Sequence, residues 1–252
     1  MKILALFFLG LVQGLTEFLP VSSSGHLALF SRMFGLEETL FVSILLHMAT
    51  LLSILVVFRK DVLKMICRPF SKETMLIVCA TIPTAIIVLL FLPLLKMSFD
   101  GTFLAVCFLI SGTMLLCAEN LSKDRQIGKI DAKTAIFMGF MQGVAAFPGI
   151  SRSGSTLAAG LVQGKDKKET AKFSFVMSIP IIIASLIMEI FEVASGKIQI
   201  CHPWWALVCA FVIAFVVGLF AIKFVVRMVE KTKLKWFACY LFAISAVALF
   251  VV

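Results

Sequence analysis

Charged residues are scarce in this chain. Only 15% of its 252 residues are Asp, Glu, Lys or Arg and 61% are hydrophobic, whereas soluble domains are about 45–50% apolar. This composition argues against a soluble protein, and the sequence lacks the regular alternation that a membrane β-barrel would need. It has instead apolar runs near the roughly 20 residues with which a helix crosses a bilayer, namely 40–58, 74–95, 102–118, 173–190, 203–222 and 236–252. We therefore predict an all-α polytopic membrane protein that forms a single integral membrane domain over residues 1–252.

Two other signals are missing. The seven cysteines include no CxxC pair and lie mostly inside apolar runs, so we interpret them as packing residues and not as a metal or redox site. No small-residue cleavage site follows the apolar stretch 1–10, and polar Gln13 and Glu17 come directly after it. We therefore expect this stretch to remain in the mature protein.

Positive charge is concentrated between the apolar runs. Most of the 23 Lys and Arg residues lie in the segments 59–74, 119–133, 164–172 and 223–235, whereas the segments 96–101 and 192–202 carry a single Lys each. Because cytoplasmic loops of membrane proteins are enriched in Lys and Arg, we expect the four basic segments inside the cell and both chain termini outside. Membrane topology accounts for the net charge of +9. We therefore predict that the chain has the lipid bilayer as a partner and does not bind nucleic acid.

An internal repeat divides the chain. The stretch 10–26 aligns without a gap with 139–155, and seven of the seventeen positions are identical. These are Gly10/Gly139, Gln13/Gln142, Gly14/Gly143, Phe18/Phe147, Ser22/Ser151, Ser24/Ser153 and Gly25/Gly154. Three apolar runs follow each copy, an odd number, so the second copy has to be inserted upside down, and the loop charges agree. We predict two inverted-topology repeats, about 1–118 and 134–252, joined by a cytoplasmic connector, 119–133, with six full crossings.

Each repeat opens with a broken helical unit. The apolar stretches 3–12 and 134–145 are too short to span a membrane, and Pro, Gly and Ser residues that interrupt a helix follow them. The second unit lies between two basic segments, so we expect it to dip into the membrane from the cytoplasmic side and return, and the first unit to do so from outside. Broken backbone inside a membrane needs protein or water around it. The two hairpin tips are therefore expected to meet near the midplane around a wet cavity.

The tips carry groups suited to an anion. Serine is a favoured N-cap, and the N-terminus of a helix offers free N–H groups and a partial positive charge, which suits phosphate. Glycine lets a ligand approach the backbone closely. The predicted phosphate-binding residues are Ser22, Ser24, Gly25, Ser151, Ser153, Gly154 and Thr156.

Arg152 and Glu17 are the charges that stand out in these units. An arginine flanked by apolar sequence usually marks a site, and its planar fork suits phosphate; a structural pair with Glu17 or Glu189 is the alternative. Glu17 is a candidate general base or a ligand for a hard cation such as Mg²⁺ or Ca²⁺, and pairing with Arg152 is compatible with either role.

Other polar residues belong to the predicted site with less defined roles. His26 shares its tip with three serines and Glu17, and it is a candidate nucleophile or general acid/base. Gln13 and Gln142 either line the cavity or cross-link the hairpins, and His47 either lines the cavity or is simply hydrogen-bonded. No Walker loop, DxDxT or GxSxG pattern offers a competing phosphate or hydrolase site.

The two motifs QGLTEFLPVSSSGH and PGISRSGST resemble the signatures of the undecaprenyl-pyrophosphate phosphatases, the BacA-type bacitracin-resistance family. The resemblance covers the whole chain. It implies hydrolysis of undecaprenyl pyrophosphate to the monophosphate and phosphate, which recycles the lipid carrier of bacterial peptidoglycan synthesis. It also implies a multi-pass protein of the bacterial inner membrane, a site open to the periplasmic side and help from a divalent cation.

Matching by motif position places Glu17, Ser22, Ser23, His26, Ser151, Arg152, Ser153 and Thr156 in the site. Some relatives in this family have a second glutamate where this chain has Gln13, and family members with Gln at this place are also familiar. Because residue 13 is Gln here, Glu17 is the only acid of the first motif. In the resulting hypothesis Glu17, Ser23, His26 and Arg152 are catalytic, and the nucleophile is Ser23, His26 or a water that one of them activates. The isoprenoid tail would lie in a groove between apolar helices.

Two other functions are compatible with parts of the pattern. Inverted repeats with broken helices also describe many secondary transporters, so a transporter or flippase for a polyprenyl phosphate or another anion is the main alternative. Such a protein has less use for His26 and the clustered hydroxyls. A purely structural membrane scaffold leaves Arg152 and Glu17 unexplained. The sequence leaves the oligomeric state open, a homodimer included.

Overall fold

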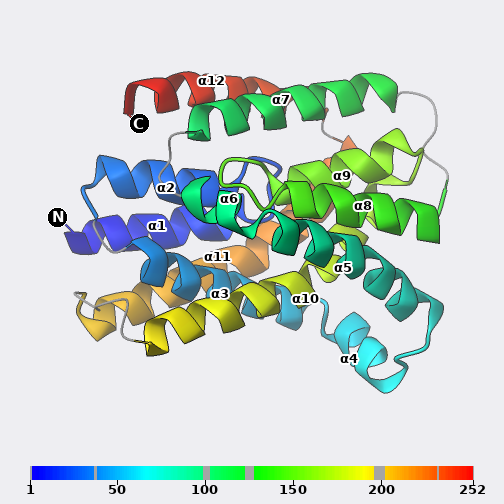
Figure 1. Ribbon diagram of the computed structural model, residues 1–252, viewed down its shortest axis with the longest axis horizontal. Coiled ribbons are helices and arrows are strands. Elements are labelled where there is room, and N and C mark those ends of the chain that lie inside the picture. Colours follow the sequence, from blue (N-terminus) through cyan, green and yellow to red (C-terminus); the bar gives the residue numbers. More distant parts are fainter. Residues whose placement is uncertain are drawn as a thin grey trace.

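The computed structural model describes residues 2–36, 39–98, 103–122, 128–195, 202–231 and 233–251 (Figure 1). Within these ranges the chain forms twelve α-helices and no strand. The helices are α1 Lys2–Thr16, α2 Ser23–Met33, α3 Thr39–Val57, α4 Arg59–Cys67, α5 Lys72–Leu90, α6 Leu92–Ser98, α7 Leu104–Leu121, α8 Ala132–Val144, α9 Arg152–Val162, α10 Lys167–Ala194, α11 Trp204–Lys231 and α12 Lys235–Val251. The all-α prediction is confirmed.

Several helices suit a bilayer. In the described part of the chain, four helices are long and apolar enough to cross a membrane, namely α5, α7, α10 and α11. The pair α3–α4, bent by 80°, offers a fifth span. The helix α12 covers the sixth apolar run, but with 17 residues it is at the lower end of the length of a spanning helix. The chain is a multi-pass membrane protein.

The two broken units form helical hairpins, α1–α2 and α8–α9. In Figure 1, α1 and α2 extend from the left end toward the middle of the molecule, and α8 and α9 extend from the right end. The loops that join the helices of each hairpin therefore meet in the middle. Proline and glycine supply the breaks, with Pro20 in the first loop and Pro148 and Gly149 in the second.

Glycines at matching positions of the two hairpins let helices pack closely. A Cβ atom added to Gly10 of α1 would lie 2.6 Å from the carbonyl oxygen of Ala210 on α11, and one added to Gly139 of α8 would overlap the carbonyl oxygen of Ala80 on α5. Small residues at helix contacts are the usual means of close packing between membrane helices. Each hairpin is thus held by a long helix from the other half of the chain.

The described residues of the basic segments gather at one end of the bundle (Figure 1). An ion pair of 2.8 Å joins Lys172 to Asp61, and one of 2.6 Å joins Lys165 to Asp131 at the start of α8. The Lys165 hydrogen bond holds the pKa of the Asp131 carboxyl well below its ordinary value. The backbone N–H of Leu234 also donates to Glu119 across 2.8 Å. The two chain termini lie at the opposite end (Figure 1).

We expect Gly139→Val to lower the stability of the protein by about 1–3 kcal/mol, because the new side chain would overlap the backbone of α5. Thermal unfolding of the detergent-purified protein measures the change. The control is Gly35→Asn, since Gly35 has a φ of +61° and no atom within 4 Å of its added Cβ, and asparagine tolerates this conformation. Equal melting temperatures of Gly139→Val and wild type would contradict the packing argument.

Candidate active site

Each hairpin tip ends where a serine begins the next helix. Ser22 is the N-cap of α2 and its Oγ accepts a hydrogen bond of 3.3 Å from the Gly25 N–H. Ser151 is the N-cap of α9 and its Oγ accepts one of 3.1 Å from the Gly154 N–H. The expectation that serines cap a helix at each tip is confirmed, with α2 beginning at Ser23 and α9 at Arg152.

The two tips interlock. The hydroxyl of Ser153 in the second hairpin donates to the carbonyl oxygen of Leu19 in the first, over 2.7 Å. An added Cβ on Gly25 would lie 2.9 Å from the Cα of Gly149 and 2.7 Å from the Phe108 ring, and one on Gly154 would meet the Ser151 side chain. Protein atoms thus occupy the space beside both glycines, so packing explains why they lack a side chain.

Strain is localised at the first tip. Ser22 has a φ of +68°, and it is the one non-glycine residue with positive φ among the described residues. Such a conformation is uncommon for a residue with a side chain, and strained backbone clusters at functional sites. The turn places Ser23 immediately beside Glu17.

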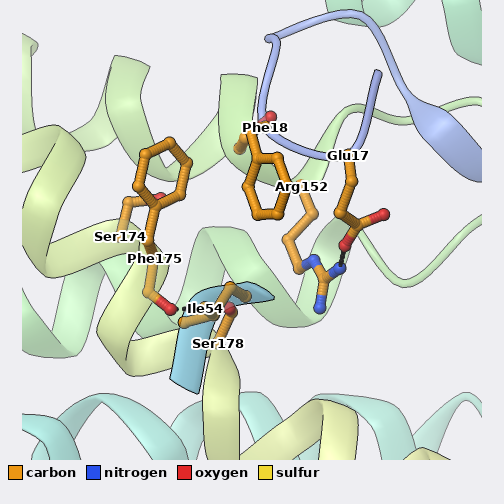
Figure 2. A pocket seen from close by; sticks show the side chains of 8 residues that line it. Glu17, Phe18, Ile54, Arg152, Ser174, Phe175 and Ser178 are labelled. Carbon is orange, nitrogen blue, oxygen red and sulfur yellow. Dashed lines mark hydrogen bonds and ion pairs between the residues drawn. The ribbon is translucent and has the colours of Figure 1, made fainter. Parts of the chain in front are cut away.

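An ion pair joins the two tips at their centre. The Arg152 guanidinium of α9 contacts Glu17 Oε1, and Figure 2 shows the two groups pointing at each other. The Glu17 side chain is 2% exposed and that of Arg152 is 24% exposed. The alternative in which Arg152 pairs with Glu17 is therefore observed, while the Glu189 side chain lies outside the described part of the structure.

The other carboxylate oxygen of Glu17 accepts from polar neighbours. Oε2 receives the Ser23 hydroxyl at 2.5 Å and the Gln13 amide at 3.0 Å, and His47 Nε2 lies 3.7 Å away. Gln13 also donates to Thr50 Oγ1 over 3.3 Å. Gln13 and His47 thus belong to the site, and Ser23 is the hydroxyl in direct contact with a candidate base.

A small cavity lies beside the ion pair. Its volume is about 10 Å³, the room of about one water molecule. The Phe18 and Phe175 rings, 5.6 Å apart and nearly perpendicular, form its apolar side (Figure 2). Ser153, Ser174 and Ser178 add hydroxyl groups to its wall. A diphosphate does not fit this space as it stands.

His26 lies in the same tip but is turned away from Glu17. Its Nδ1 is 2.7 Å from the Ser22 carbonyl oxygen, and its Nε2 is 2.6 Å from the Tyr240 hydroxyl. Because a carbonyl can only accept, Nδ1 carries a proton, and in the neutral ring Nε2 accepts from Tyr240. The Tyr240 ring stacks on the imidazole at 5.6 Å and 4°. Both nitrogens are thus occupied by protein groups, and His26 is buried.

The remaining predicted residues lie around the tips, and several of them bond to neighbouring helices. Ser151 and Thr156 are buried, and the Thr156 hydroxyl bonds to Ser174 Oγ at 2.6 Å. Ser24 is half-buried in the first turn of α2. Gln142 donates to Thr84 on α5 over 3.3 Å, so it cross-links the second hairpin to α5. Its repeat mate Gln13 likewise donates to a threonine of another helix over 3.3 Å, but Gln13 also reaches Glu17.

A cation has a limited set of ligands here. Among the described residues, no group of three His, Cys, Asp or Glu side chains is arranged to hold a metal ion. The buried Gln13 Oε1 has no hydrogen-bond partner in the described structure, and it belongs to the residue that contacts Glu17. A carboxylate, an amide oxygen and substrate phosphate oxygens are the ligand types that Mg²⁺ prefers, so the residues present fit a cation that arrives with the substrate.

The structure adds residues that sequence reasoning missed. Tyr240 of α12 contacts His26, and Ser111 of α7 receives the Ser151 N–H at 2.9 Å while donating to the Gly149 carbonyl. Ser174 and Ser178 of α10 line the cavity. These residues lie far from both motifs in sequence. The one available signal was that Tyr240 is the only tyrosine of the chain.

Comparisons with known proteins agree with these motifs. Residues 6–247 match the family model described as "Bacitracin resistance protein BacA". The chain is 38% identical over 245 residues to a protein of Carboxydothermus hydrogenoformans named undecaprenyl-diphosphatase, covering 96% of this chain and 94% of that one. It is 39% identical over 243 residues to a protein of that name from Parabacteroides distasonis, covering 92% and 91%. It is 36% identical over 252 residues to undecaprenyl-diphosphatase 4 of Bacillus thuringiensis subsp. konkukian, covering 99% and 97%.

We expect Tyr240→Phe to cost about 1–3 kcal/mol of stability, because it leaves the buried Nε2 of His26 without its partner while the stacked ring remains. Unfolding in detergent measures the loss, and ¹⁵N spectroscopy of His26 reports the broken hydrogen bond. Trp236→Phe, also on α12 but exposed, is the control and should leave the His26 signal in place. An unchanged His26 signal in Tyr240→Phe would show that the hydroxyl does not hold the ring.

Proposed function

Because the chain belongs to the bacitracin resistance protein BacA family, we propose that it hydrolyses undecaprenyl diphosphate to undecaprenyl phosphate and inorganic phosphate, which would recycle the lipid carrier of peptidoglycan synthesis. The observation that carries the proposal is the contact of a carboxylate, Glu17, with both a hydroxyl, Ser23, and a cation, Arg152. The names of the relatives favour this enzyme over a transporter.

The diphosphate binds between the two hairpin tips. Arg152 exchanges the Glu17 carboxylate for a phosphate group. Two N–H groups of its guanidinium can bind two phosphate oxygens in a bidentate way. The N–H groups of the first turns of α2 and α9 supply further donors, and both helix N-termini favour an anion. In the described structure, the N–H groups of Ser23, Ser24, Arg152 and Ser153 have no hydrogen-bond partner within the protein. The Ser153 hydroxyl is also close by, on the cavity wall.

The Ser23 hydroxyl is the nucleophile of the proposed reaction. Once the phosphate has replaced Glu17 at Arg152, Glu17 accepts the Ser23 proton while Ser23 Oγ forms a bond to the terminal phosphorus. The bond from that phosphorus to the bridging oxygen breaks, and undecaprenyl phosphate leaves. Glu17 passes this proton to the departing undecaprenyl phosphate and is a carboxylate again. It then deprotonates a water that attacks the phosphoserine, the bond between Ser23 Oγ and phosphorus breaks, and the serine oxygen takes the proton from Glu17 as inorganic phosphate leaves. A hydroxyl nucleophile needs a base within hydrogen-bond reach, and Ser23 meets this condition at 2.5 Å.

His26 has a positioning role in this scheme. Its ring nitrogens bind Ser22 and Tyr240, so it fixes the strained turn that presents Ser23 to Glu17. A divalent cation, Mg²⁺ or Ca²⁺, is also proposed to take part, with Glu17 and the Gln13 amide oxygen as its protein ligands. Such a cation neutralises charge on the diphosphate when it is bound.

We further propose that the chain consists of two inverted repeats whose hairpins re-enter the bilayer. Matching glycines of α1 and α8 pack on α11 and α5, as exchange of equivalent helices between two inverted halves would require. The basic segments at one end indicate the cytoplasmic side, so both termini and the opening to the site would face the periplasm of a bacterial inner membrane. The isoprenoid tail would leave the site between apolar helices.

Arg152→Ala is expected to lower phosphate release from undecaprenyl diphosphate by about 100-fold or more, because a charged donor to the transition state is lost. Arg152→Lys should retain part of the activity, since it keeps the charge but not the fork. Arg227→Ala, an exposed arginine of α11, is the control and should hydrolyse like wild type. Near-normal hydrolysis by folded Arg152→Ala would contradict the proposed mechanism.

Ser23→Ala is expected to abolish turnover through removal of the nucleophile, and acid quenching of the wild type during turnover should trap phosphate on the peptide that contains Ser23. Mass spectrometry of the quenched protein detects the adduct. Ser31→Ala, farther along the same helix and buried, serves as the matched control. Loss of the nucleophile should reduce turnover by more than about tenfold. If Ser23→Ala turned over within about tenfold of wild type, covalent attack by Ser23 would be excluded and water would be the nucleophile.

A further inference from the structure

A second cavity lies at the basic end of the bundle, separate from the Glu17–Arg152 site. Its volume is about 490 Å³, and residues of α4, α5, α10 and the segment 129–130 line it. It shares no lining residue with the cavity beside the ion pair. The size is within the range of about 300–1,000 Å³ that is typical of ligand sites.

The lining of this cavity carries more positive than negative charge. Two of its four lysines are neutralised within the cavity, because Lys64 contacts Glu73 and Lys172 contacts Asp61 at 2.8 Å. Lys72 and Lys129 also line the cavity, are exposed, and form no ion pair with any described residue. Against these two free lysines stands one further acid in the lining, Glu169. An anion would therefore be attracted, and the N-terminus of the 19-residue α5, which opens into the cavity at Ser71, adds to this attraction.

Part of the cavity wall is apolar. Met65 of α4, Leu76 and Ile77 of α5, and Phe173 and Val176 of α10 contribute to it. A free inorganic anion gains nothing from such a surface, whereas an amphipathic ligand can place its charged group among the lysines and its hydrocarbon against these side chains. The chemistry of the wall therefore favours a lipid over a free ion.

Helix α4 places this cavity at the membrane surface. It turns by 80° from the apolar helix α3, so it runs nearly parallel to the membrane plane if α3 crosses the bilayer. None of its residues is buried. Leu63 and Ile66 are 58% and 70% exposed, and Phe70, just beyond the helix, is 89% exposed. A short helix with one apolar and one basic face lies in the interface between headgroups and acyl chains. Its polar residues Asp61 and Lys64 line the cavity.

We propose that this cavity binds the headgroup of an anionic phospholipid from the leaflet at the basic end, with Lys72 and Lys129 at the phosphate and the upper part of an acyl chain along the apolar wall. Basic pockets between membrane helices on the cytoplasmic side are suited to such headgroups. The site would anchor α4 and α5 to their leaflet. The proposal does not depend on the hydrolytic activity, because it concerns different residues and is tested through binding.

The test compares short-chain phosphatidylglycerol with short-chain phosphatidylcholine, each titrated into the detergent-purified protein while the melting temperature is followed. We expect a saturable rise with phosphatidylglycerol alone. The double variant Lys72→Gln/Lys129→Gln should need roughly 30-fold more of this lipid for half of the effect, because each lysine contributes about a fivefold factor to such binding. Lys72→Arg/Lys129→Arg should bind like wild type.

The control is Lys231→Gln/Lys233→Gln, which removes two exposed lysines, one at the end of α11 and one just beyond it, in another basic segment. Equal weakening in both glutamine variants would show general surface attraction and overturn the site. A rise produced to the same extent by inorganic phosphate would show a free-anion site and overturn the lipid. Should the glutamine variant not fold, native mass spectrometry of the wild type decides, since equal retention of the two lipids contradicts the proposal.

Discussion

The contact between Glu17 and Arg152 is the interaction on which the site depends. Each residue comes from the tip of a different hairpin, and each hairpin comes from a different half of the chain. A buried charge without a partner is strongly destabilising, and loss of one partner from such a pair typically costs about 3–5 kcal/mol. The pair therefore fixes how the tips meet, and its geometry decides which hydroxyl lies next to the carboxylate. In the proposed function an anion bound to Arg152 would use the same positions, because phosphate oxygens can take the place of the carboxylate.

The remainder of the molecule keeps broken backbone inside an apolar bundle. Hairpin loops expose N–H and C=O groups, and these need partners when no water is near. Here serine caps, the Ser111 hydroxyl and the link from Ser153 to Leu19 supply many of them. Long helices cover the hairpins through close contacts at Gly10 and Gly139. The glycines and several of the serine hydroxyls thus have a structural purpose, and Glu17, Arg152 and the Ser23 hydroxyl are left for the proposed chemistry.

Charged residues gather in two places, the centre of the bundle and its basic end. The central pair serves the proposed hydrolysis, whereas the lysines at the far end form ion pairs among α4, α5 and α10 and surround a wide cavity. Both places would take a phosphate group, but in different settings. At the centre two helix N-termini and an arginine confine the anion, and at the basic end lysines and an apolar wall suit a lipid of the surrounding leaflet.

The sequence by itself determined the class of the protein, its helices and most of the central site. Apolar runs are long enough to specify helices, and prolines, glycines and serines at fixed spacing specify where the hairpins break, so Ser22, Ser151, Glu17 and Arg152 were found from local pattern alone. Tertiary structure decided the partners. It turned His26 toward Tyr240, placed Ser23 on Glu17, brought Ser174 and Ser178 to the cavity, and gave Gln13 and Gln142 different neighbours. These contacts join segments far apart in the chain, and their geometry follows from helix packing, which no single stretch of sequence encodes.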